Sequence, residues 1–114
     1  MQAVIQSLRH TNKNAYTKVM DMKIGSCVVT FRAPWVQSLK EKRMVLKSLV
    51  EKTKHKFNVS IAEVDTPDNH KILTIGFACV SNSAQHAGEM VAQILSFMEN
   101  ATDAEMIAVT QEVI

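Results

Sequence analysis

Positively charged side chains are concentrated in one short segment of this chain. Residues 38–56 hold seven Lys and Arg against two Glu, a local net charge of +5, whereas the whole chain of 114 residues carries +2. The other 95 residues therefore sum to −3. Amine and guanidinium groups gathered in this way bind phosphate groups, so the segment indicates a polyanionic partner such as RNA.

Four of these cations share one flank of the helix that the segment predicts. At 100° per residue, they follow one another across about 60° of a helical wheel, in the order Arg43, Lys54, Lys47 and Lys40. Such a row can follow a phosphate backbone, with the lysines as point charges and Arg43 as a forked donor. The alternative is an ordinary solvated helix face whose long stems cover the edge of the core. The sequence leaves both interpretations open.

A fifth cation of the segment is expected to have a structural role. Lys42 falls inside the apolar sector of the same helix, and Arg43 lies at the edge of that sector. Glu63 has the inward parity of the strand that follows. We therefore expect Glu63 to pair with Lys42 or with Arg43 in a partly buried ion pair.

No set of residues with catalytic or metal-binding spacing is found in the sequence. Cys27 and Cys79 lie in apolar strand-like runs, which favours buried reduced thiols over a disulfide, and neither has a nearby His that would activate it. His70 follows a turn rich in Asp and Asn, where backbone capping accounts for the carboxylates. We predict no enzyme activity, no metal and no cofactor.

The elements that carry these residues alternate between strand and helix periodicities. Ser38 and Glu41 form a capping box at the start of the first predicted helix. The predicted strands span 24–32, 57–65, 71–80 and 104–114, and the predicted helices span 38–56 and 83–100. The order β-α-β-β-α-β predicts an α+β ferredoxin-like sandwich, with a four-stranded antiparallel sheet and both helices on one face.

The other face of this sheet is expected to be open and weakly polar. Strand parity directs small apolar side chains onto it, among them Val28, Val64, Ile72, Ala78 and Val80. An antiparallel sheet with one face in water normally alternates apolar and polar residues. The pattern fits either a surface that merely favours strand formation or a face that is covered by a second subunit, a small ligand or the N-terminal extension.

The remaining features of the sequence concern its division into segments and its cellular compartment. Residues 1–21 have no sustained periodicity and are predicted to be a flexible N-terminal extension of one domain, 22–114. No apolar run approaches the roughly 20 residues that a membrane helix needs, and the start of the chain has no apolar core of a secretory signal. We therefore expect a cytoplasmic protein.

Several motifs resemble one known family. Ser38-Leu-Lys-Glu-Lys-Arg43, Phe57-Asn-Val-Ser-Ile-Ala-Glu-Val64 and Val80-Ser-Asn82 are similar to the YlxP-like small bacterial proteins of unknown function, over roughly Met22 to Ile114. The resemblance implies a ferredoxin-like fold and a bacterial cytosolic protein, often encoded near genes of translation and ribosome maturation. It assigns no activity. The family commonly has a Trp in the hairpin where this chain has His70-Lys71-Ile72.

Two functional hypotheses follow. The first is a non-enzymatic accessory factor that associates with RNA or the ribosome through Lys40, Arg43, Lys47 and Lys54. The alternative is a homodimeric interaction module, or a regulatory module for a small ligand, that uses the open sheet face. Phosphate contacts weaken steeply with salt, whereas an apolar interface is nearly indifferent to it, so a salt series separates the two.

Overall fold

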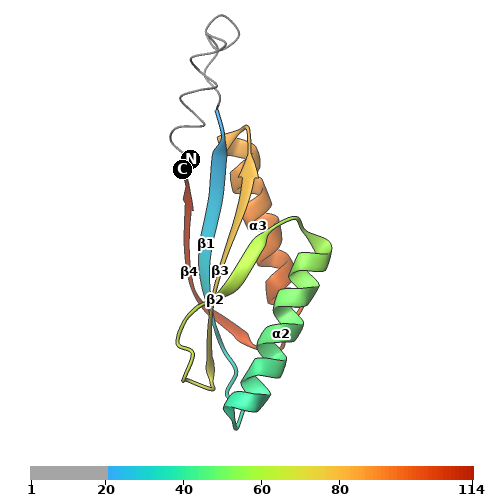
Figure 1. The fold of residues 1–114 in the computed structure, drawn as a ribbon, viewed down its shortest axis with the longest axis vertical. Coiled ribbons are helices and arrows are strands. Elements are labelled where there is room, and N and C mark those ends of the chain that lie inside the picture. The colour runs from blue at the N-terminus through green and yellow to red at the C-terminus, as the bar shows by residue number, and fades with distance from the viewer. Residues whose placement is uncertain (1–20) are drawn as a thin grey trace, which may run out of the picture.

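The computed structural model describes residues 21–114. It contains four strands and two helices in the predicted order, which confirms the ferredoxin-like α+β fold (Figure 1). The elements are β1 (Lys23–Arg32), α2 (Leu39–Lys56), β2 (Ser60–Asp65), β3 (Ile72–Ser81), α3 (Ala84–Asn100) and β4 (Glu105–Val113). Apart from Asp21, the predicted extension 1–21 lies outside the described residues.

The four strands form one antiparallel sheet in the order β2-β3-β1-β4. The two central strands pair from Lys23↔Ser81 to Arg32↔Ile72 without a register shift. β2 and β4 are the two edges of the sheet. This order results when two right-handed βαβ units interleave, because each crossover leaves space for a strand of the other unit.

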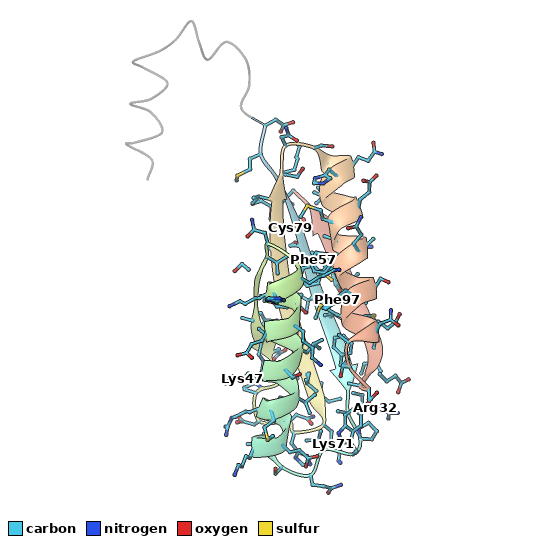
Figure 2. The ribbon with its side chains drawn as sticks, turned by 90° about the vertical axis from the view of Figure 1, so that its right-hand side faces the viewer. Arg32, Lys47, Phe57, Lys71, Cys79 and Phe97 are labelled. Carbon is cyan, nitrogen blue, oxygen red and sulfur yellow. The ribbon has the colours of Figure 1, made fainter. Side chains whose placement is uncertain are left out.

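Both helices cover the same face of the sheet (Figure 2). α3 contacts β1, β3 and β4, whereas α2 contacts β2 and α3. Alternation along the strands turns one set of apolar side chains toward the helices. The buried members of this set are Cys27, Val29, Phe31, Ile61, Leu73, Ile75, Phe77 and Cys79, all of which the strand parity predicts to face inward.

Gly25 allows α3 to approach the backbone of β1 closely. A Cβ atom at this position would lie 2.8 Å from Cγ2 of Val91 and 3.0 Å from the carbonyl oxygen of Ala87. Both distances are shorter than ordinary contacts between such atoms. The first turns of α3 therefore pack against this strand at a point where no side chain fits.

The predicted start of the second strand at residue 57 is wrong, because β2 begins at Ser60. Phe57 instead ends α2 as its C-cap residue, and its backbone N–H donates to the carbonyl oxygen of Thr53 at 2.9 Å. The Phe57 ring packs edge-to-face on Phe97, with the ring centroids 5.5 Å apart. The alternating pattern correctly predicted that the Phe57 side chain faces the core. It wrongly predicted a strand here, because the backbone of Phe57 makes the last hydrogen bond of the helix.

Candidate nucleic-acid interface

The start of α2 is fixed by the capping residues. The Ser38 hydroxyl accepts a hydrogen bond from the Glu41 amide at 3.1 Å, as the capping box predicts. The Glu41 carboxylate, however, accepts from the amide of Gln37 at 3.1 Å and not from that of Ser38. The last turn carries Lys54, His55 and Lys56, where positive charge interacts favourably with the helix dipole. Local interactions at its two ends thus stabilise the helix over these residues.

The four cations of the predicted row are all exposed on α2, and we call them the basic flank: Lys40, Arg43, Lys47 and Lys54. Figure 2 shows Lys47 on the side of α2 that points away from α3. Lys47 Nζ lies 3.9 Å from Glu51 Oε1, and both side chains are solvent-exposed, so this contact contributes little. Among residues 21–114, no carboxylate forms an ion pair with Lys40, Arg43 or Lys54.

Lys42 lies on the core-facing side of the same helix and is 1% exposed. Its ammonium is 2.9 Å from Glu63 Oε2 and donates to the carbonyl oxygen of Thr66. The expected pairing of Glu63 is therefore confirmed with Lys42, and not with Arg43. The Lys42 ammonium is close enough to Glu63 Oε2 to form an ion pair. Among the described residues, however, no N–H or O–H group donates a hydrogen bond to this buried oxygen. This buried pair connects α2 to β2 and to the hairpin turn.

A cleft of about 440 Å³ opens between α2 and the end of α3. Its lining residues are Trp35, Met44, Val45, Ser48, Leu49, Asn100, Ala101, Thr102 and Asp103. Trp35 is 42% exposed and Met44 is 67% exposed. The loop that carries Trp35 is held by Lys71, whose ammonium donates to the carbonyl oxygens of Pro34 at 2.6 Å and Val36 at 2.8 Å.

The cleft adjoins the basic flank on the surface of α2. Residues three and four positions apart are neighbours on a helix, so Met44 in the cleft has Lys40 and Lys47 beside it. The sequence did not predict this site, because its lining comes from segments far apart in the chain, namely the loop before α2, α2 itself and the end of α3. A Trp four residues before a basic helix is the one sequence signal that could have indicated it.

The open face of the sheet carries the other predicted residues. Val28, Val64 and Val80 are 41%, 55% and 61% exposed, whereas Ile72 and Ala78 are half-buried. A Cβ atom at Gly76 would lie 2.8 Å from Cγ1 of Val64, so the glycine leaves room for this valine on the face. The five residues share the surface opposite the helices, as predicted, but on a different side of the molecule from the basic flank.

The described residues contain little that resembles a catalytic centre. Cys27 and Cys79 are buried and free, and burial raises the pKa of the Cys27 thiol from 9.0 to about 11. Burial also raises the pKa of the Cys79 thiol, and a hydrogen bond with the Gly25 backbone lowers it by a smaller amount. Within residues 21–114, no three His, Cys, Asp or Glu side chains gather where they could hold a metal. No helix in this part of the chain is long and apolar enough to cross a membrane.

Comparison with known proteins places the chain in a family. It is 37% identical over 68 residues to the uncharacterized protein YlxP of Bacillus subtilis (strain 168), an alignment that covers 60% of this chain and 74% of that protein. A de novo designed protein, Foldit4, superimposes over 82% of this chain and 97% of its own, with a TM-score of 0.47 and 14% identity. The family model described as "Protein of unknown function (DUF503)" matches residues 24–111, and the chain therefore belongs to the DUF503 family.

Proposed function

We propose that the protein is an accessory factor that binds single-stranded RNA, with the basic flank of α2 on the phosphates. The observation that carries this proposal is that all four cations are exposed on one side of one helix and three of them have no carboxylate partner among the described residues. At 1.5 Å per residue, the flank from Lys40 to Lys54 is about 21 Å long, enough to contact several successive phosphates.

The cleft beside the flank supports a single strand over a duplex. Trp35 offers an exposed ring on which an unpaired base can stack, and a duplex does not present its bases in this way. Asp103 in the cleft repels phosphate and can accept a hydrogen bond from a base amino group. We infer that phosphates lie along Lys40, Arg43, Lys47 and Lys54 while one base enters the cleft.

The first test compares two charge reversals on the same helix. Lys47→Glu/Lys54→Glu changes the basic flank, and Lys52→Glu/Lys56→Glu makes the same change at exposed positions on the other side of α2. With a fluorescein-labelled single-stranded RNA as the probe, we expect the first double variant to weaken binding more than about tenfold and the second far less. Equal losses for the two variants would show that only net charge matters, and would contradict the proposal.

The second test addresses the stacked base. Stacking on an aromatic side chain contributes about 1–3 kcal/mol per base, so Trp35→Ala should weaken binding of the same RNA by roughly 5- to 150-fold. The salt dependence of binding should stay that of the unmodified protein, because no phosphate contact is lost. A Trp35→Ala variant with unchanged affinity would remove the cleft from the RNA site.

Co-sedimentation with ribosomal subunits tests whether the RNA is ribosomal. We expect association at low salt that is lost at high salt and that the variant Lys47→Glu/Lys54→Glu lacks. Association that persists unchanged at high salt would point to an apolar contact instead of phosphate binding.

The open sheet face gives a second candidate function, a docking surface for a protein or a small ligand. The exposure of Val28, Val64 and Val80 together, without a charged side chain between them, is the observation in its favour. A partner bound there should be released by Ala78→Glu and be nearly indifferent to salt. RNA binding by the same variant should be unchanged.

A further inference from the structure

The strand β4 is far more exposed than an ordinary strand of a sandwich. Eight of its nine positions are exposed, and only Met106 is half-buried. Val109 is 42% exposed, although it pairs with Val29 of β1, which is completely buried on the same face. α3 therefore covers the central strand but leaves the apolar side chains of its neighbour in contact with solvent.

The free edge of β4 also presents backbone hydrogen-bonding groups. Ile24 and Ile114 exchange both of their backbone hydrogen bonds at 2.9 Å. In an antiparallel pair such residues alternate with residues whose amide and carbonyl point the other way. Val113, Gln111 and Val109 therefore direct three amides and three carbonyls away from β1, toward the open edge. A long edge of this kind is a template for another strand.

β4 has few of the features, such as charged residues, prolines and bulges, that normally prevent an edge strand from pairing with another chain. From Met106 to Gln111 the strand has no charged residue and no proline. A register shift lies between Thr30 and Phe31 of β1, so the pairing with β4 is regular only beyond it, from Ala108 to Val113. In Figure 1, β4 forms the margin of the sheet on the side away from α2.

The neighbouring flank of α3 leaves this edge accessible. Phe97 on α3 packs against Phe57 on the α2 side, so the opposite flank of α3 faces β4. In the first half of α3, Ala84, Gly88 and Ala92 follow one another at helical spacing on that flank, whereas Leu95 further along the same flank packs on the core. A Cβ atom at Gly88 would meet nothing within 4 Å, so packing within the protomer does not require a glycine. Small side chains here leave space above the free edge for an incoming strand.

We propose that β4 pairs antiparallel with β4 of a second copy of this chain, about a two-fold axis at Gln111. This register sets Val109 opposite Val113 of the second copy and joins the three amides and three carbonyls of each strand in backbone hydrogen bonds. It also sets Glu112 opposite Thr110, so no two carboxylates face each other. A second copy is favoured over an unrelated peptide because the segment 109–113 is complementary to itself in hydrogen bonds, apolar side chains and charge.

The resulting dimer has one continuous sheet of eight strands, four from each copy. Directly paired residues point to the same face, so the helices of both copies lie on one side and Val109 of each copy packs beside Val113 of the other. The two β2 edges, with their α2 helices, lie at the far ends of the joined sheet. Both basic flanks stay exposed, so this inference is independent of the RNA-binding proposal.

Sedimentation velocity and amide hydrogen exchange of the full chain test the dimer. We expect a dimer that forms across the micromolar range, with the Val109, Gln111 and Val113 amides exchanging more slowly as it forms. Gln111→Pro removes an amide that donates to no strand of its own protomer, and proline is tolerated at sheet edges. This variant should be a folded monomer. Ala78→Glu on the open face is the matched control and should remain a dimer.

The outcomes that would overturn the inference are distinct. A monomer at all concentrations contradicts it, as does a dimer that Ala78→Glu dissociates and Gln111→Pro leaves intact. Slow exchange of the three amides in a monomer would mean that another segment of the same chain occupies the edge. Should Gln111→Pro not fold, Val109→Lys places a charge on an exposed position of the same edge. This variant should also be a folded monomer, and a Val109→Lys dimer would contradict the inference.

Discussion

At the scale of single residues, neighbouring cations of one helix have different roles. Lys40 and Arg43 are exposed, whereas Lys42 between them is buried against Glu63 and the Thr66 carbonyl. The helical period alone makes this separation, because 100° per residue turns Lys42 into the apolar sector. The sequence could therefore predict the buried cation and its carboxylate partner. It could not choose between Lys42 and Arg43, since the choice depends on where β2 lies beneath the helix.

The buried pair gives a prediction on stability. Lys42→Met leaves the Glu63 carboxylate without its counter-charge and should lower the free energy of unfolding by about 3 kcal/mol. Adding Glu63→Leu should restore most of this loss, because an apolar pair replaces the ion pair. Urea unfolding measures both, with Lys40→Met as the exposed control, which should stay within about 0.5 kcal/mol of the unmodified protein. A Lys42→Met variant as stable as this control would contradict the structural role.

The Cys27 thiol predicts a loss of stability at alkaline pH. Burial raises its pKa from 9.0 to about 11, so the folded protein retains a proton that the unfolded chain releases first. The stability linked to this proton is complete below pH 9 and is lost as the pH rises to about 11, by roughly 2–3 kcal/mol. Urea unfolding of the unmodified protein and of Cys27→Ala at pH 8 and pH 11 should show the stability gap shrinking by this amount. A constant gap would rule out the linkage.

At the scale of the elements, local signals predicted both helices and all four strands. The Ser38 cap, the apolar stripes and the alternation of the strands were each sufficient for their own element. The errors occur where tertiary structure determines the outcome. The alternating pattern predicted that Phe57 belongs to a strand, whereas in the structure Phe57 is the C-cap residue of α2. The sequence could not predict the exposure of β4 either, because its apolar residues are of the types found in buried strands. They are exposed only because α3 does not cover them.

Two glycines, one in β1 and one in α3, give opposite predictions for the same change to alanine. Gly25→Ala places a Cβ 2.8 Å from Val91 and 3.0 Å from a backbone oxygen, so it should destabilise the fold by about 1–3 kcal/mol. Gly88→Ala has no neighbour within 4 Å and should stabilise α3 by about 0.5–1 kcal/mol. Urea unfolding at low protein concentration measures both. Equal effects of the two changes would show that α3 does not pack closely on β1.

At the scale of the whole molecule, the topology distributes three surfaces over different sides. The basic flank lies on α2 at one margin, the free edge of β4 lies at the other, and the open face lies opposite the helices. The sequence predicted the residues of the basic flank and of the open face. It could not predict the cleft, because Trp35, Met44 and Asp103 come from three separate segments of the chain. Their common position depends on tertiary contacts, such as those of Lys71 with the loop that carries Trp35.

The salt dependence of RNA binding tests the central claim most directly. Four phosphate contacts on a single strand predict that log K falls with log[salt] at a slope of about −2.8. Lys47→Gln/Lys54→Gln removes two of these contacts and should reduce the slope to about −1.4, whereas Lys52→Gln/Lys56→Gln should leave it at the value of the unmodified protein. A flank variant that binds the same RNA with an unchanged slope would show that α2 does not contact phosphate, and would contradict the account.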